Sequence, residues 1–225
     1  MDAVIKIGGS IAEDPERLRA LCTKLSEFAK KYAITVVPGG GKFADVVRDF
    51  DKRFTLSSGI AHRMAILGMD QFGLILSQII PNSCATYLLN DAKQLSEIGV
   101  VPIFLPSRLM FKENPLENSW IVTSDSIAAY VASRLRAAKV LLVTDVDGIF
   151  TKDPKRHSDA KLIERLSVKE LLKFNQRTSV DLYLPKLLLE SEIDCYVVNG
   201  KHPERIEAIL AGQQATCTLI VTRTE

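Results

Sequence analysis

The chain alternates short, almost continuously apolar runs with amphipathic segments, and this alternation sharply restricts the folds open to it. Apolar runs that predict strands lie at 3–7, 33–37, 99–105, 119–122, 139–144, 195–198 and 218–222. Helical spacing of apolar residues, or a helix-starting signal, predicts helices at 15–31, 42–53, 57–80, 124–137, 167–174, from Pro185 onward, and at 203–211. Strands that are apolar throughout are typical of parallel sheets with helices on both faces. We therefore predict an α/β fold with a mostly parallel central sheet.

Composition and charge exclude several classes of protein. The 225 residues carry a net charge of +2, so we expect no bulk attraction to nucleic acid or to anionic lipid. No apolar run reaches the roughly 18 residues of a membrane span, and no leader precedes the first strand, so we expect a cytoplasmic protein. The four scattered cysteines predict buried free thiols rather than a disulfide framework or a zinc site.

A lysine inside the first predicted strand is the most unusual local feature. In the segment VIKIGGS, Lys6 lies close to the strand end, and Gly8 and Gly9 follow it. Ligands of parallel sheets bind beyond the carboxyl ends of the strands, where bare glycine N–H groups can approach an anion. The alternative is a lysine that reaches solvent beside an ordinary turn.

A second glycine turn follows the second predicted strand. The segment VVPGGGK places Gly39, Gly40 and Gly41 immediately before a helix, whose free N–H groups favour a phosphate or carboxylate. The spacing of a Walker A loop is absent. Two glycine-rich turns in consecutive strand-to-helix connections favour anion binding more than either turn alone.

Three further segments allow both a structural and a functional interpretation. Asp125 lies in the first turn of a predicted helix, where a carboxylate stabilises the dipole without any other role. Lys186 follows Pro185 in another first turn, where a cation opposes the dipole unless an anion is bound nearby. The segment at 141–154 is either a surface turn or a nucleotide-binding edge, since Asp and Gly serve both.

The long helix at 57–80, opened by Ser57 or Ser58, carries the remaining candidate, His62. A lone histidine on a helix is more often a satisfied packing residue than a ligand. Contact with a substrate is the alternative interpretation.

In this order, the segments KIGGS, PGGGKFAD, TSDSIAA, TDVDGIFTKDP and LPKLLLE resemble the amino acid kinase superfamily, which includes acetylglutamate, uridylate and isopentenyl phosphate kinases. The resemblance implies a three-layer α/β/α fold with an acceptor lobe at 1–137 and an ATP lobe at 138–225 on one continuous sheet. It also implies that Lys6 and Lys186 flank the transferred phosphoryl group and that Asp125 orients them. The implied ATP contacts are Gly8, Gly9, Ser10, Thr144, Asp145, Asp147, Gly148, Phe150, Lys152 and Pro154, and the implied acceptor contacts are Gly39, Gly40, Gly41, Ser58 and His62.

Within the superfamily, AHRMAILGMDQFG and TSVDLYLPK look most like small kinases assigned to methanofuran biosynthesis. That likeness implies ATP with Mg²⁺ as cofactors and [5-(aminomethyl)furan-3-yl]methyl phosphate as the small-molecule acceptor, converted to its diphosphate. Uridylate, isopentenyl phosphate and acetylglutamate kinase-like activities remain alternatives, as does a non-catalytic nucleotide-binding relative. No metal-ligand set is expected in the chain itself, and a homo-oligomer is expected only from the relatives.

Overall fold

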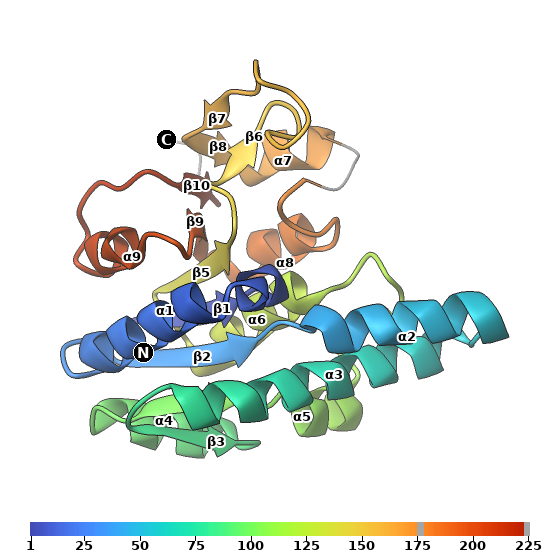
Figure 1. Ribbon diagram of the computed structural model, residues 1–225, viewed down its shortest axis with the longest axis horizontal. Helices are drawn as coiled ribbons and strands as arrows, with labels where there is room; N and C mark the ends of the chain where they lie inside the picture. The colour runs from blue at the N-terminus through green and yellow to red at the C-terminus, as the bar shows by residue number, and fades with distance from the viewer. Residues whose placement is uncertain (175–177, 223–225) are drawn as a thin grey trace.

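A computed structural model describes residues 1–174 and 178–222 and shows an eight-stranded sheet between layers of helices (Figure 1). The strand order is β3-β4-β2-β1-β5-β9-β10-β8. These strands are β1 (Ala3–Ile7), β2 (Ile34–Pro38), β3 (Ser83–Thr86), β4 (Val101–Phe104), β5 (Lys139–Thr144), β8 (Arg165–Ser167), β9 (Asp194–Asn199) and β10 (Thr218–Val221). All pairings are parallel except that of β9 with β10, so the predicted mostly parallel α/β fold is confirmed. A small antiparallel pair, β6 (Ile149–Phe150) and β7 (Leu162–Ile163), lies outside this sheet.

Two apolar clusters pack on opposite faces of the sheet. Along β1, Val4 belongs to one cluster, while Ala3, Ile5 and Ile7 belong to the other. The Val4 face is covered by helices that include α6 (Ser124–Leu135) and α8 (Leu184–Ser191), with α4 (Leu89–Glu97), α5 (Ser107–Glu113) and α7 (Val168–Lys173). The other face is covered by α1 (Pro15–Ala29) and α9 (Pro203–Leu210), with the far half of α3 (Ser58–Ile79). Side-chain alternation along β1 therefore directs Lys6 to the face of α6.

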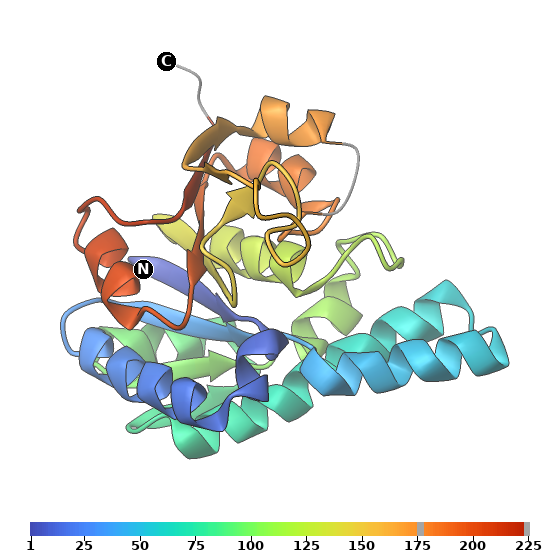
Figure 2. The ribbon, with the colours of Figure 1, turned by 45° about the horizontal axis from the view of Figure 1, so that its top comes forward.

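The centre of the sheet contains a topological switch. From β1 the chain moves to β2, then to the edge strand β3 and back inward to β4, and it returns to pair β5 with the other side of β1. Ligands in open α/β sheets bind at such a switch, beyond the carboxyl ends of the strands. The chain leaves β1 at this edge through a short 3₁₀ helix, η1 (Gly9–Glu13), and leaves β2 through α2 (Gly41–Phe54). Helix α2 and the first half of α3 form an antiparallel arm that projects away from the sheet (Figure 2).

The structure corrects the sequence prediction in two places. Residues 119–122 form no strand; the Trp120 indole instead donates a hydrogen bond to Asp51 on α2, at 2.7 Å. Strands β3, β6, β7 and β8 and helices η1, α4 and α5 were not predicted, because each is short or carries few large apolar residues at regular spacing. Only Ala92 and Ser96 are buried in α4, and β3 lies at the sheet edge.

The remaining fold-level expectations have mixed outcomes. Cys22, Cys195 and Cys217 are buried free thiols as predicted, but Cys84 on the edge strand is exposed. Among residues 1–174 and 178–222, no helix has both the length and the apolar character needed to span a bilayer. The lobe boundary near residue 138 stays a prediction, since one sheet runs through both segments.

Candidate active site

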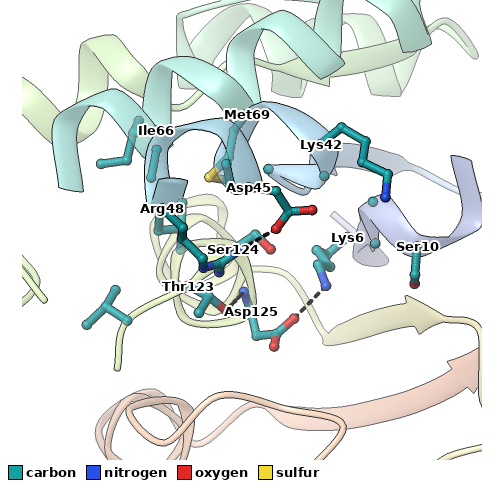
Figure 3. Close-up of a pocket in the computed structure, with 18 of the residues that line it drawn as sticks. Lys6, Ser10, Lys42, Asp45, Arg48, Ile66, Met69, Thr123, Ser124 and Asp125 are labelled. Atoms are coloured by element: carbon teal, nitrogen blue, oxygen red, sulfur yellow. Dashed lines mark hydrogen bonds and ion pairs between the residues drawn. The ribbon is translucent and has the colours of Figure 1, made fainter. Parts of the chain in front are cut away.

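A cavity of about 270 Å³ opens beyond the carboxyl ends of β1 and β5 (Figure 3). Its lining comes from six parts of the chain that are far apart in sequence. They are the end of β1 with the turn after it, the start of α2, the first half of α3, the loop before α6 with the first turn of α6, the end of β5, and Ser179 before α8. The cavity therefore lies at the topological switch that the strand order defines.

Lys6 and Asp125 form a buried ion pair in this cavity. Their Nζ and Oδ1 atoms are 2.7 Å apart, and the side chains are only 11% and 5% exposed. The strand directs Lys6 toward the first turn of α6, where Asp125 also accepts a hydrogen bond from the Asp181 N–H at 3.2 Å. Asp125 is thus more than a helix cap, because it fixes the position of the lysine ammonium (Figure 3).

The two glycine turns touch each other at the edge of the cavity. A Cβ atom on Gly9 would lie 2.1 Å from the Gly41 Cα, and Gly41 has a left-handed backbone with φ of +51°. Gly8, Gly9 and Ser10, predicted as ATP contacts, and Gly40 and Gly41, predicted as acceptor contacts, all line this cavity. The Gly8 N–H, however, already donates to the Val143 carbonyl at 2.8 Å, so it is not a free donor for an anion.

Asp181 joins the N-termini of α6 and α8, and sequence reasoning assigned it no role. Asp181 is only 3% exposed, and its carboxylate accepts six hydrogen bonds. The donors are the N–H and hydroxyl groups of Thr123 and Ser126 and the N–H groups of Tyr183 and Leu184. Burial, followed by the nearby charge of Asp125, raises the pKa of Asp181 above its ordinary value. An Asp just before a Pro-initiated helix was the sequence signal for this cap.

Replacing Asp181 with alanine is expected to lower the free energy of unfolding by about 2–3 kcal/mol, because it leaves several buried donors without an acceptor. Urea unfolding curves would measure the loss. The matched control is Asp14→Ala, which removes a helix cap that accepts from one N–H, that of Arg17, and should cost about 1 kcal/mol. Equal losses in the two variants would contradict the joining role of Asp181.

The outer wall of the cavity carries charged and aromatic residues that were not predicted as site residues. Asp45 and Arg48 on α2 are paired at 2.8 Å, and the Arg48 guanidinium lies 4.8 Å from the centre of the Trp120 ring. Glu13 and Lys42 form a second, more exposed pair at 3.0 Å. The available signal was helical spacing, since positions 41, 45 and 48 share one face of the helix that the glycine turn begins.

His62 also lines the cavity, as the resemblance implied, and it is buried on α3. Burial lowers the pKa of its imidazole below the ordinary value of 6.5. His62 is therefore neutral at pH 7, and it can hydrogen-bond a ligand but supplies no positive charge.

His62 should make the folded protein less stable as the pH falls below 6.5. Above pH 6.5 both the folded and the unfolded chain keep this imidazole neutral, so it adds no pH dependence. Below that pH the unfolded chain binds the proton first, so the folded state loses stability as pH falls toward the lowered pKa. Melting temperatures at pH 7.5 and 5.5 should show a smaller decrease for His62→Gln than for wild type or for the exposed control His157→Gln. A decrease of the same size in all three proteins would contradict this origin.

A second cavity of about 330 Å³ lies beside the first, and the two share Thr144 and Ser179 in their linings. It contains six of the predicted nucleotide contacts: Thr144, Asp145, Gly148, Phe150, Lys152 and Pro154. Burial by itself would raise the pKa of Asp145, but the Lys155 ammonium, 2.5 Å from its carboxylate, outweighs burial, and the pKa of Asp145 is lowered. The predicted ATP contacts are thus divided between the two cavities, since Gly8, Gly9 and Ser10 line the first cavity with predicted acceptor residues. Their roles stay predictions.

Four predicted residues line neither cavity. The Asp147 carboxylate accepts from Asn199 and Arg205, at 2.9 and 2.6 Å. Gly39 donates its N–H to the Ile7 carbonyl, and Ser58 is exposed at the start of α3, on the projecting arm. Lys186 is exposed in the first turn of α8, with its Nζ 5.2 Å from the centre of the Tyr183 ring. Its expected approach to the triphosphate stays a prediction.

The chain is a phosphotransferase and belongs to the Amino acid kinase family, whose model matches residues 1–199. A relative from Methanocaldococcus jannaschii, [5-(aminomethyl)furan-3-yl]methyl phosphate kinase, is 38% identical over 220 residues, 97% of both chains. A uridylate kinase from Thermococcus kodakarensis is 24% identical over 229 residues, which are 96% of this chain and 97% of the relative.

Solved structures show the same fold. The crystal structure of uridylate kinase from Archaeoglobus fulgidus has a TM-score of 0.78 at 24% identity, covering 98% of this chain and 100% of that one. The UMP kinase from Bacillus anthracis has a TM-score of 0.79 at 20% identity, covering 99% and 96% of the two chains. These structures confirm the fold, while the family model and the 38% identical relative confirm the family resemblance found in the sequence motifs.

Proposed function

We propose that this kinase transfers the γ-phosphoryl group of ATP to the phosphate of [5-(aminomethyl)furan-3-yl]methyl phosphate, forming the diphosphate. The observation that carries this proposal is the buried Lys6–Asp125 pair, which lies in the cavity next to the predicted nucleotide contacts. The 38% identity to the M. jannaschii kinase over nearly the whole length supports the choice of acceptor. ATP would occupy the cavity around Asp145 and Lys152, and the acceptor would occupy the cavity around Lys6 and His62.

The transfer requires alignment and charge more than covalent help from the protein. A phosphate oxygen of the acceptor attacks the γ-phosphorus, and the bond from that phosphorus to the β–γ bridging oxygen breaks, so that ADP leaves. A phosphate monoester is an anionic nucleophile near neutral pH, and no general base is needed. Lys6, fixed by Asp125, would stabilise the transferred group, and the N–H groups of Gly9, Gly40 and Gly41 would position phosphate oxygens.

The residues present fit Mg²⁺ that arrives with ATP rather than a metal held by the chain. Among the described residues, no group of three His, Cys, Asp or Glu side chains could hold a metal ion. Mg²⁺ typically needs only one or two carboxylates besides phosphates and waters, and the nucleotide cavity carries two, Asp145 and Asp153, of which Asp145 is the predicted nucleotide contact. Bound there, the ion would neutralise charge on the β- and γ-phosphate oxygens.

We also propose that Lys186 contacts the ATP phosphates. It makes no ion pair within residues 1–174 and 178–222, and it opposes the dipole of α8, which a bound anion would offset. Asp181 holds the first turn of this helix beside the first turn of α6, which carries Asp125.

Release of ADP with three candidate acceptors tests the proposed function. The purified protein, ATP and Mg²⁺ are incubated with [5-(aminomethyl)furan-3-yl]methyl phosphate, UMP or isopentenyl phosphate, and ADP is measured. We expect the furan phosphate to give the highest kcat/KM. A preference for UMP or isopentenyl phosphate would overturn the acceptor, whereas nucleotide binding without ADP from any acceptor would favour a non-catalytic relative.

A further inference from the structure

The cavity contains a second ion pair, Asp45 with Arg48, to which the transfer mechanism assigns no role. Both residues lie on α2, and their side chains are directed toward the cavity that Lys6 enters from β1 (Figure 3). Unlike the Lys6–Asp125 pair, it is accessible, since the Asp45 side chain is 58% exposed. An accessible pair of this kind contributes little to stability, so a role in ligand binding is the stronger explanation for its place in the cavity.

Contacts on one side hold Asp45 in place and leave the other side open. Its Oδ1 atom accepts from Arg48 Nη1 at 2.8 Å, and Oδ2 has no hydrogen-bond partner among the described residues. The Arg48 guanidinium packs on Trp120, and the Trp120 indole donates to Asp51 one helical turn further along α2. Because these contacts keep Arg48 in place, Asp45 can bind a second cation without reorganising the wall.

The proposed acceptor has charges of both signs, one at each end of a small ring. Its phosphate must lie near Lys6 for transfer, and its aminomethyl group is protonated near neutral pH, as a lysine amine is. The cavity offers three carboxylates for that ammonium: Glu13, Asp45 and Asp125. Asp125 is committed to Lys6, and Glu13 is paired with Lys42 in a contact that is 62% and 78% exposed. Asp45 is also paired, with Arg48, but it lies on α2, which packs against α3, the helix that carries Ile66 and Met69 in the cavity wall. We therefore select Asp45.

Apolar residues complete the match with an aromatic ring. Ile66 and Met69 from α3 and Val122 from the loop before α6 line the same cavity as Asp45. A flat furan ring would bury apolar surface against these side chains while its two substituents reach opposite charges. We propose that Asp45 binds the acceptor ammonium group and thereby selects phosphate monoesters that carry a cation. This inference rests on the proposed function.

The test compares the aminomethyl acceptor with (5-methylfuran-3-yl)methyl phosphate, which lacks the amine. For each protein, the ratio of kcat/KM for the two acceptors measures recognition of the ammonium. In wild type this ratio should favour the amine, and Asp45→Asn should lower it about tenfold, as expected for a lost hydrogen bond between charged groups. A decrease that affects both acceptors equally would indicate a structural role and overturn the inference.

Asp49→Asn is the matched control. Asp49 lies one turn further along α2, pairs with Arg53 at 2.6 Å and lines neither cavity, so its substitution should preserve the ratio. Wild type that uses both acceptors without preference would overturn the Asp45 inference and leave the kinase proposal standing. Wild type that uses neither acceptor would overturn the proposed acceptor, and the inference with it.

Discussion

Replacing Lys6 with methionine is expected to lower turnover by about 10²–10³-fold, as for the loss of one preorganised group that stabilises the transition state. The same change removes one partner of a buried ion pair, since the Lys6 and Asp125 side chains are 11% and 5% exposed. It should therefore also lower the free energy of unfolding by about 3–5 kcal/mol, because the Asp125 charge is left uncompensated. Initial rates of ADP release at saturating substrates, taken well below the melting temperature, measure the first effect. Urea unfolding measures the second.

Lys42→Met provides the control for Lys6. Lys42 lines the same cavity, but its pair with Glu13 is largely exposed, and such pairs contribute little to stability. The control should keep turnover within about threefold of wild type, as expected for a weak, solvent-screened pair. Near-normal turnover in Lys6→Met, in protein shown to be folded, would overturn the phosphoryl-transfer role of this lysine.

Replacing Lys186 with methionine is expected to lower turnover by a similar factor of about 10²–10³, but without loss of stability. The physical reason for the contrast is exposure, since Lys186 makes no ion pair within the described residues and its removal leaves no buried charge. The expected signature is a loss of kcat, with a melting temperature equal to that of wild type. Rates at several ATP concentrations would separate an effect on ATP binding from one on transfer.

Lys169→Met is the matched control, because Lys169 is exposed on the neighbouring helix α7 and lines neither cavity. It should leave turnover and stability unchanged. If Lys186→Met behaves like Lys169→Met, the lysine is a surface residue, and transfer depends on Lys6 without a partner from α8.

The predictable part of the site lies in the backbone turns that end strands. Lys6, Gly9 and Gly41 were found because an apolar strand followed by glycines has one location in a parallel sheet, at its carboxyl edge. Asp125 was found as a first-turn residue, but its pairing with Lys6 depends on β1 and α6 facing each other. No local pattern in the sequence encodes that distance.

The missed part lies in side chains whose partners are distant in the sequence. Asp181 lies 58 residues from Thr123, and Trp120 lies 69 residues from Asp51, so neither contact has a local signal. The aromatic and β-branched residues at 119–122 favoured a strand, but the hydrogen bond from Trp120 to Asp51 on α2 holds this segment in a loop. Asp147 shows the opposite case, because its turn chemistry suggested a ligand, whereas the structure pairs its carboxylate with Arg205 and Asn199. Its contact with a nucleotide stays a prediction.

The contact between Gly9 and Gly41 has a consequence for how the protein can evolve. Because a methyl group at position 9 would overlap the main chain of residue 41, and Gly41 has a left-handed backbone, neither position can acquire a side chain without moving or straining the turns. A new acceptor specificity therefore has to arise from the α2 and α3 arm and the loop at 114–123, while the floor beneath the reacting phosphates stays fixed. Directed evolution libraries would do best to vary those walls and leave positions 9 and 41 untouched.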